Sequence, residues 1–146
     1  MKVLLLLGFV FLSMVVRGRA LEKCEFAKKA KELGLDGYED HSIGEWVCLV
    51  QGESNFDTSV TNHNDADRST DYGPFQINDR YWCNGELPDG ANQCGVDCSE
   101  LLGDDIRKSV ECAKKIVSQQ GIEAWVAWQN NCQGQDFSTY VQDCDL

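Results

Sequence analysis

The chain has 146 residues, with 13 basic and 24 acidic side chains, and its net charge is −11 at neutral pH. The first twenty residues hold three of the basic side chains and no acidic one, so residues 21–146 have a net charge of −14. Nucleic acids and anionic membranes attract cationic surfaces, and this balance therefore argues against both as partners.

The first twenty residues have the pattern of a secretory signal peptide. Lys2 precedes an apolar run over residues 3–16, and Gly18 and Ala20 supply the small side chains that a signal peptidase needs. The run is shorter than the roughly 20 apolar residues that span a membrane. We predict cleavage after Ala20 and a secreted, monomeric protein with one domain over residues 21–146.

All eight cysteines lie within residues 21–146. An even number in a small secreted domain predicts four disulfides, although the sequence alone leaves 105 pairings open. A zinc site is the alternative. It is disfavoured because the close pair Cys94 and Cys98 lacks a second such pair or a histidine at zinc spacing.

Two helices are predicted at the start of this domain. Residues 24–33 are good helix formers, and Gly34 ends the run. Ser42 and Glu45 then form a predicted capping box, in which each side chain accepts a hydrogen bond from the other residue's amide. The apolar residues that follow recur with a helical period: Ile43, Trp46, Val47 and Val50.

Glu53 lies in the last turn of this second predicted helix, at the edge of its apolar stripe. The partial negative charge of a helix C-terminus disfavours an ionised carboxylate by about 0.3–1 kcal/mol. That is less than the 1.36 kcal/mol of one pKa unit, whereas burial can raise a carboxyl pKa by several units. A strongly raised pKa at Glu53 would therefore have burial as its main cause.

The next segment is polar and predicts short strands joined by turns. Residues 55–70 are dense in Asp, Asn, Ser and Thr without a helical period, and we expect residues 62–67 to form one turn. Residues 75–78 alternate apolar and polar side chains, which predicts a half-buried strand. Gln76 and Asn78 would then face a ligand, while the apolar pair faces the core.

The rest of the chain is predicted to be a long loop followed by helices. Residues 79–103 form a loop that its cysteines hold together. Asp104 and Asp105 suit a helix start better than a ligand pair. A short helical segment covers residues 125–128, and residues 134–146 are mostly irregular. The apolar face of the third predicted helix contains Ile106, Val110, Ala113, Ile116 and Val117.

Two carboxyls in unlike surroundings are the main chemical signal. Glu53 ends an apolar helical stripe, and Asp71 lies in a polar turn just before a strand. Glycoside hydrolysis needs one carboxyl that holds a proton and another that stays ionised. Taken alone, each is more common as a surface acid or a turn residue. His41 and His63 lie apart in polar turns and are predicted to be surface side chains.

Six motifs, in this order and spacing, resemble those of the c-type (chicken-type) lysozymes of the lysozyme/α-lactalbumin family. They are Glu53-Ser54-Asn55, Ser69-Thr70-Asp71-Tyr72-Gly73, Phe75-Gln76-Ile77-Asn78, Tyr81-Trp82-Cys83-Asn84, Cys112-Ala113-Lys114-Lys115 and Ala124-Trp125-Val126-Ala127-Trp128. The resemblance covers residues 21–146 and implies an α+β fold, with a helical lobe and a small antiparallel β lobe flanking a cleft. It also implies the disulfides Cys24–Cys144, Cys48–Cys132, Cys83–Cys98 and Cys94–Cys112.

The resemblance implies hydrolysis, with retention, of the β-1,4 bond between N-acetylmuramic acid and N-acetylglucosamine in peptidoglycan. Glu53 matches the general acid, Asp71 the second carboxylate, and Trp125 the tryptophan that desolvates the acid. Lysozyme is itself the type case of this division of roles. The positions that match sugar-binding residues are Gln76, Asn78, Tyr81, Trp82, Trp125 and the backbone carbonyl of Ala124. Chitooligosaccharides are a second expected ligand, and no cofactor is implied.

The chain departs from the family pattern at three places. Gly52 precedes Glu53 and is expected to loosen the hold on it, because glycine weakens a helix end and removes packing. Pro74 predicts an irregular or edge strand start. Some relatives bind calcium in the loop before the third helix. This chain keeps Asp105 there but has Gly103, Lys108 and Ser109 at three of the ligand positions, so we predict no metal site.

Two other functions fit the same residues less well. A non-catalytic saccharide-binding or regulatory relative, α-lactalbumin-like or sperm-surface-like, usually lacks one or both carboxyls, whereas this chain has both. A purely structural disulfide-linked domain leaves the cleft residues unexplained. The charge of −14 should repel anionic cell walls at neutral pH and low salt, which favours activity in acid.

Overall fold

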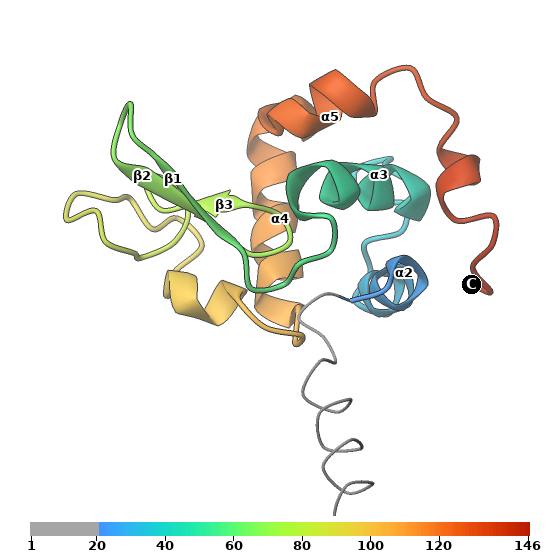
Figure 1. Cartoon of the computed structure of the whole chain (residues 1–146), viewed down its shortest axis with the longest axis horizontal. Coiled ribbons are helices and arrows are strands. Elements are labelled where there is room, and N and C mark those ends of the chain that lie inside the picture. Colours follow the sequence, from blue (N-terminus) through green and yellow to red (C-terminus); the bar gives the residue numbers. More distant parts are fainter. Residues whose placement is uncertain (1–20) are drawn as a thin grey trace, which may run out of the picture.

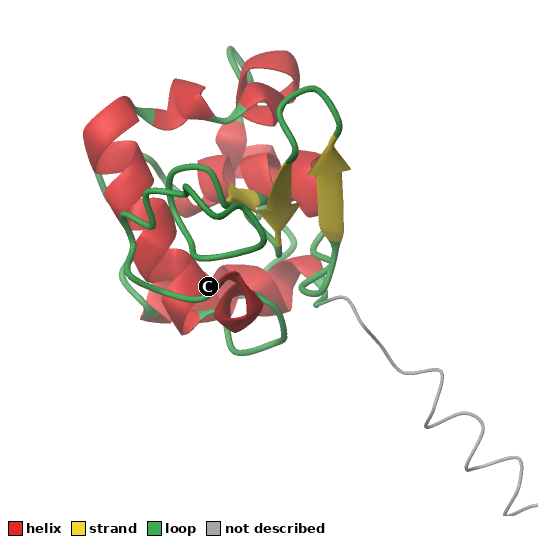
Figure 2. Cartoon of the chain, turned by 90° about the vertical axis from the view of Figure 1, so that its left-hand side faces the viewer, coloured by secondary structure: helices red, strands yellow, loops and turns green. Residues whose placement is uncertain are grey.

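A computed structural model describes residues 21–146, and the predicted signal peptide at residues 1–20 lies outside the described residues. Helices gather on one side and a small sheet on the other, as Figure 1 shows, and Figure 2 views the strands in front of the helices. The α-helices are α2 (Lys23–Glu32), α3 (Ile43–Ser54), α4 (Arg107–Gln120) and α5 (Val126–Asn131). The strands are β1 (Thr61–Asn64), β2 (Ser69–Tyr72) and β3 (Ile77–Asn78). Short 3-10 helices are η1 (Cys98–Leu101), η2 (Ile122–Ala124) and η3 (Phe137–Tyr140). The predicted α+β fold is confirmed.

The three strands form an antiparallel sheet in the order β1-β2-β3. The prediction of a turn over residues 62–67 is wrong, because β1 continues to Asn64 and pairs it with Ser69. The reversal falls instead between the strands, where the Asp67 carboxylate accepts hydrogen bonds from the amide and hydroxyl of Ser69. These side-chain bonds to the neighbouring backbone close the turn later than the composition of the segment suggested.

The predicted strand over residues 75–78 is confirmed only for β3, its second half. Residues 73–76 form a turn that is closed by a 3.0 Å hydrogen bond from the Gln76 amide to the Gly73 carbonyl. Gly73 and Gln76 both have positive φ, and Pro74 between them has no N–H to give to a ladder. The irregular strand start predicted from Pro74 is therefore confirmed.

Helix α3 starts at Ser42, as predicted, but the capping box is only half formed. The Ser42 hydroxyl accepts a hydrogen bond from the Glu45 amide at 3.3 Å. The Glu45 carboxylate does not return it, because it is buried (7 % exposed), accepts a 2.8 Å bond from Trp128 Nε1 and lies 2.9 Å from His41 Nδ1. His41 is consequently half-buried, so the prediction of a surface side chain is wrong for it and right for the exposed His63.

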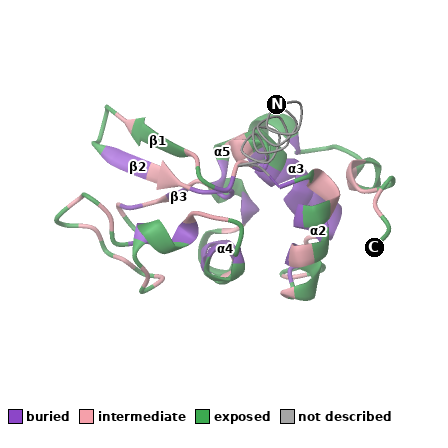
Figure 3. Cartoon of the chain, turned by 60° about the horizontal axis from the view of Figure 1, so that its bottom comes forward, coloured by how far each residue is buried: buried purple, intermediate pink, exposed green. Residues whose placement is uncertain are grey.

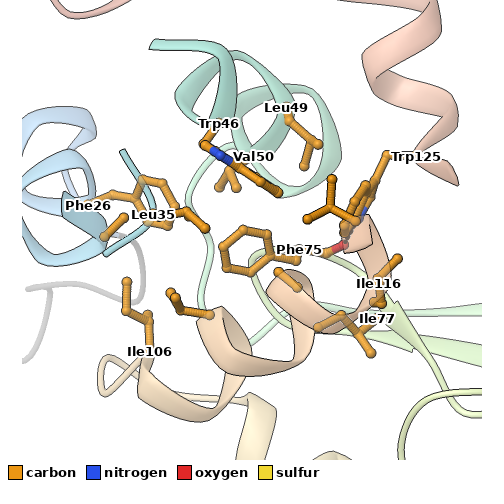
Figure 4. Packing of buried hydrophobic residues seen from close by; sticks show 14 of the residues in the cluster. Phe26, Leu35, Trp46, Leu49, Val50, Phe75, Ile77, Ile106, Ile116 and Trp125 are labelled. Atoms are coloured by element: carbon orange, nitrogen blue, oxygen red, sulfur yellow. Dashed lines mark hydrogen bonds between the residues drawn. The ribbon is translucent and has the colours of Figure 1, made fainter. Parts of the chain in front are cut away.

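The core is built from buried side chains of α2, α3, α4, α5 and the turn before β3. In Figure 3, α3 is largely buried whereas β1 is largely exposed. Phe75, which is fully buried, packs between Phe26 of α2 and Trp46 of α3, with ring centroids 5.9 and 6.2 Å away (Figure 4). The sheet lobe is thus attached to the helical lobe through an aromatic side chain that directly precedes Gln76.

Four disulfides join distant parts of the described chain. They are Cys24–Cys144, Cys48–Cys132, Cys83–Cys98 and Cys94–Cys112. The first two hold the helical lobe, and the last two hold the loop of residues 79–103 and attach it to α4. None of the helices within residues 21–146 is long and apolar enough to cross a membrane.

Candidate active site

A cavity of about 220 Å³ lies between the two lobes and contains both predicted carboxyls. Helix α3 contributes Glu53 and strand β2 contributes Asp71, while β3, α4 and the segment before α5 supply the other walls. The predicted residues in the lining are Glu53, Asp71, Gln76, Asn78, Trp82, Ala124 and Trp125. The lining also includes Ile77 and Val126, which lie in the motifs but had no predicted role in the site, and Ile116 and Gln120, which lie outside the motifs.

A larger hollow of about 450 Å³ lies between α2 and the start of α4. Its cations are already paired within the chain, because Lys29 Nζ donates to the Asp104 carbonyl and Arg107 forms a 2.6 Å ion pair with Asp105. Neither Glu53 nor Asp71 lines it. The chemistry of the lining, rather than the volume, therefore identifies the cavity between the lobes as the candidate active site.

The Glu53 carboxyl is half-buried and has a raised pKa. Burial raises the pKa of Glu53 to about 7, hydrogen bonding to the Ala127 backbone opposes the rise, and the negative charge of Asp71 adds to it. Burial is the largest of these causes, as predicted from the position of Glu53 at the edge of an apolar stripe. Near neutral pH this carboxyl therefore holds a proton in a large fraction of molecules.

Trp125 forms part of the apolar lining of the cavity. Its ring is 5 % exposed, and it meets the ring of Trp46 edge to face with centroids 5.8 Å apart. Its indole N–H donates a 2.9 Å hydrogen bond to the Phe75 carbonyl, so the ring is fixed from both lobes. A tryptophan held this rigidly keeps water away from one side of the cavity.

Asp71 lies in a polar environment built by the sheet. Asn78 Nδ2 donates to its Oδ1 at 2.9 Å, and Asn64 Nδ2 donates to its Oδ2 at 3.3 Å. The antiparallel register sets Asn78 directly opposite Asp71 on β3. Both amides also donate to the Ser69 hydroxyl, which orients them. Each oxygen of Asp71 thus has a side-chain amide donor, and the sheet holds the carboxyl group in place.

The predicted sugar-binding residues are only partly gathered. Gln76 is held by Asn62, by the Val60 carbonyl and by the Gly73 carbonyl. Tyr81 does not line the cavity, and 51 % of it is exposed beside the buried Trp82. The Tyr81 ring is therefore free at the surface, where it could contact only a substrate that extends beyond the cavity.

Two residues beside the carboxyls have roles that the motifs did not predict. Ser54, next to Glu53, donates a 2.8 Å hydrogen bond from its hydroxyl to the Pro74 carbonyl. This bond ties the end of α3 to the turn before β3. Gly52 faces α5, because an added Cβ would lie 3.0 Å from Asn131 Nδ2 and 3.2 Å from Ala127 Cβ. The expected loss of packing at Gly52 is wrong, since α5 already fills most of that space.

The segment before α4 pairs its own charges. Asp105 accepts hydrogen bonds from the guanidinium and from the backbone amide of Arg107, which lower the pKa of the aspartate to about 2. Lys108 pairs with Glu100, and the buried Ser109 hydroxyl donates to the Leu101 carbonyl. Asp105 and Glu100 are thus paired with Arg107 and Lys108. Cations at these positions disfavour calcium, which requires a shell of oxygen ligands.

A four-disulfide α+β domain with two unlike carboxyls lining a cavity between its lobes has the architecture of the lysozyme class. The model of the C-type lysozyme/alpha-lactalbumin family matches residues 19–144, and the chain belongs to this family. The resemblance predicted from the motifs is thereby confirmed.

Proteins named lysozyme C are similar to this chain over the whole length of both sequences. Lysozyme C of Trichosurus vulpecula is 59 % identical to it. The tracheal isozyme of lysozyme C of Bos taurus is 54 % identical, and lysozyme C of Macaca mulatta is 53 % identical. Each alignment covers 100 % of both chains.

Proposed function

We propose that the protein is a lysozyme that hydrolyses, with retention, the β-1,4 bond between N-acetylmuramic acid and N-acetylglucosamine in bacterial peptidoglycan. The observation that carries this proposal is the contrast between the two carboxyls in one cavity. Glu53 has a pKa raised to about 7 by burial, whereas Asp71 is surrounded by amide donors. An acid and a carboxylate side by side are the two groups that this reaction needs.

In the proposed mechanism the Glu53 carboxyl donates its proton to the leaving glycosidic oxygen as the C–O bond breaks. The Asp71 carboxylate attacks the anomeric carbon from the opposite face and forms a glycosyl ester. Glu53, now ionised, takes a proton from a water that cleaves this ester. Two displacements at the same carbon restore the original configuration, and both carboxyls return to their starting states.

The remaining cavity residues suit a chain of N-acetylated sugars. Gln76, Asn78 and Ala124 line the cavity together with Asp71, and we assign the Ala124 carbonyl as an acceptor for a sugar amide. Trp82 and Trp125 supply apolar faces that match those of sugar rings. We assign Tyr81 to a sugar outside the cavity, because its exposed ring lies next to Trp82 in the sequence.

We further propose that residues 1–20 are removed on secretion and that residues 21–146 act as a monomer without a metal or cofactor. Four disulfides suit an oxidising, extracellular setting. The charge of −14 and the pKa of about 7 at Glu53 both favour work at acidic pH, where fewer surface carboxyls repel the cell wall. A lytic optimum above neutral pH at low salt would contradict the acidic setting.

A turbidity assay on purified peptidoglycan tests the activity. We expect the wild type to clear the suspension and Glu53→Gln to lose about 10²–10⁴-fold of the rate, because general acid catalysis contributes about that much. Glu111→Gln is the charge-matched control, since Glu111 is exposed on α4, away from the cavity lining, and pairs with Lys114. If the wild type binds chitooligosaccharide without cleaving peptidoglycan, the non-catalytic saccharide-binding alternative replaces the proposal.

A further inference from the structure

Asp79 is a fully buried carboxyl that the proposed reaction does not use. It follows β3 directly, and its side chain is 0 % exposed. The Asp79 amide donates a 3.1 Å hydrogen bond to the Thr70 carbonyl, and Asp79 Oδ1 accepts a 2.9 Å bond from the Thr70 amide. Thr70 directly precedes Asp71. Asp79 therefore binds both backbone groups of the residue beside the proposed nucleophile: its carboxylate binds the Thr70 N–H, and its amide binds the Thr70 carbonyl.

These two bonds extend the pairing of β2 beyond the end of β3. The register pairs Tyr72 with Ile77 and Asp71 with Asn78, and the next pair in line is Thr70 with Asp79. At this pair a carboxylate oxygen takes the place of the backbone carbonyl as acceptor. Strand β2 therefore remains hydrogen-bonded at Thr70, on the N-terminal side of Asp71, even though β3 ends at Asn78.

The other oxygen of Asp79 lies near the residue that follows Asp71. Oδ2 is buried and has no hydrogen-bond partner within residues 21–146. A Cβ built on Gly85 would lie 2.8 Å from Asp79 Oδ2 and 2.9 Å from the Tyr72 hydroxyl. Both groups thus face Gly85, and only a glycine leaves them room. The charge of Asp79 adds to the burial that raises the pKa of Tyr72, which agrees with this proximity.

We propose that Asp79 is a positioning residue for Asp71. Asp79 fixes the backbone of β2 through Thr70, while Asn78, the residue before Asp79, holds the Asp71 carboxylate. The inference rests on the proposed function, because it concerns the placement of the nucleophile. Loss of the carboxylate leaves the amide of the buried Thr70 without its acceptor, and the strand then shifts to satisfy it. A shift of about 1 Å in a reacting group can cost about 10²-fold in rate.

The test compares Asp79→Ala and Asp79→Asn with the wild type on a defined chitooligosaccharide, at a temperature well below the melting point of every variant. We expect Asp79→Ala to lower kcat by about 10–100-fold with KM changed less than about threefold. Asp79→Asn keeps an oxygen acceptor for the Thr70 amide and should restore kcat to within about fivefold of the wild type. This rescue separates the acceptor role from the charge of Asp79.

Glu45→Ala is the matched control, because Glu45 is also a buried carboxyl but binds Trp128 and His41 in the helical lobe. We expect it to lower the melting temperature and leave kcat within about threefold of the wild type. Gly85→Ala is the second variant if Asp79→Ala does not fold, since the new methyl presses on Asp79 Oδ2 without removing it. Gly85→Ala should also lower kcat.

The outcomes separate this inference from the proposed function. If the wild type is inactive, or if Glu53→Gln is as active as the wild type, the proposed function fails. If the wild type is active and Glu53→Gln is not, but folded Asp79→Ala or Gly85→Ala retains the wild-type kcat, the positioning role of Asp79 is wrong. Equal losses of kcat in Asp79→Ala and Glu45→Ala would also overturn it, because both would then reflect stability alone.

Discussion

The helical lobe and the sheet lobe each present one carboxyl to the same cavity, and they treat it in opposite ways. Around Glu53 the helical lobe removes water and raises the pKa to about 7. Around Asp71 the sheet supplies amide donors from Asn64 and Asn78. The two lobes therefore place two similar side chains in unlike surroundings, one apolar and one rich in hydrogen-bond donors.

The two lobes are joined close to these carboxyls. Ser54 binds the Pro74 carbonyl, and Trp125 binds the Phe75 carbonyl, so α3 and the segment before α5 both attach to the turn that leads into β3. In both bonds a side chain of the helical lobe donates to a backbone carbonyl of the turn. Two hydrogen bonds to consecutive carbonyls thus connect the lobes close to Glu53 and to β3.

Asp71→Asn tests the sheet side of the contrast and has the largest expected effect after Glu53→Gln. Loss of the negative charge should lower kcat by about 10²–10³-fold, because a carboxylate no longer attacks or stabilises the anomeric carbon. Asp65→Asn is the control in the same lobe, since the Asp65 side chain is fully exposed. A kcat for Asp71→Asn within tenfold of the wild type, with Asp65→Asn unchanged, would remove Asp71 from the mechanism.

Trp125→Phe tests the helical side. A smaller ring without an N–H loses the bond to Phe75 and admits water toward Glu53, so the pKa of Glu53 should fall. Glu53 must be protonated to act as the acid, and the wild-type kcat/KM should therefore decline as pH rises through about 7. In Trp125→Phe this decline should begin at lower pH, with the maximal rate reduced by less than about tenfold.

A pH–rate profile for each protein checks this shift. Tyr140→Phe, which changes a half-buried ring packed on the core away from the cavity lining, is the control and should keep the wild-type profile. An unchanged alkaline limb in Trp125→Phe would mean that other groups desolvate the acid.

Glu53→Gln should stabilise the protein in a pH-dependent way. The pKa of Glu53 is about 7 in the folded state and 4.5 in the unfolded reference, so its contribution to stability is fully present below about 4.5 and is lost as pH rises through about 7. Glutamine stays neutral and does not incur this loss. Because Glu53 is partly in contact with solvent, we expect a gain of about 1 kcal/mol at pH 8, roughly 3 °C in melting temperature.

Calorimetric scans of both proteins from pH 4 to pH 8 measure this difference. The melting temperature of Glu53→Gln should approach that of the wild type at the acidic end and exceed it at the alkaline end. A constant difference across this range would mean that Glu53 titrates alike in the folded and unfolded states.

The parts of the structure that were predictable from the sequence are those with a local cause. The apolar period of α3, the irregular start at Pro74 and the position of Glu53 at the end of an apolar stripe all follow from residues close together in the chain. The family resemblance located Asp71. Each of these features depends on a side chain and its near neighbours, which a sequence displays directly.

The parts that were missed depend on partners far away in the chain. Glu45 does not complete the predicted capping box because its carboxylate accepts a hydrogen bond from Trp128, which lies 83 residues further along the chain. Gly52 was expected to leave a gap, but α5 closes it from 75 residues further along. The role of Ser54 likewise depends on a carbonyl 20 residues away. Such long-range contacts override local patterns because burial and hydrogen bonding outweigh intrinsic preferences.

Gly52→Ala has the smallest expected effect and tests how closely α5 must approach Glu53. Alanine favours the helix by up to about 1 kcal/mol, but its methyl would lie 3.2 Å from Ala127 Cβ and would push α5 outward by a few tenths of an ångström. Because the Ala127 backbone opposes the rise in the pKa of Glu53, weakening this contact should move the alkaline limb of kcat/KM slightly upward. We expect kcat to change by less than about threefold and the melting temperature by less than about 3 °C. Adding Asn131→Ala to Gly52→Ala removes the other near contact and should relieve the strain in this double variant. If the alkaline limb of kcat/KM for Gly52→Ala moves to lower pH instead, Ala127 does not restrain the acid.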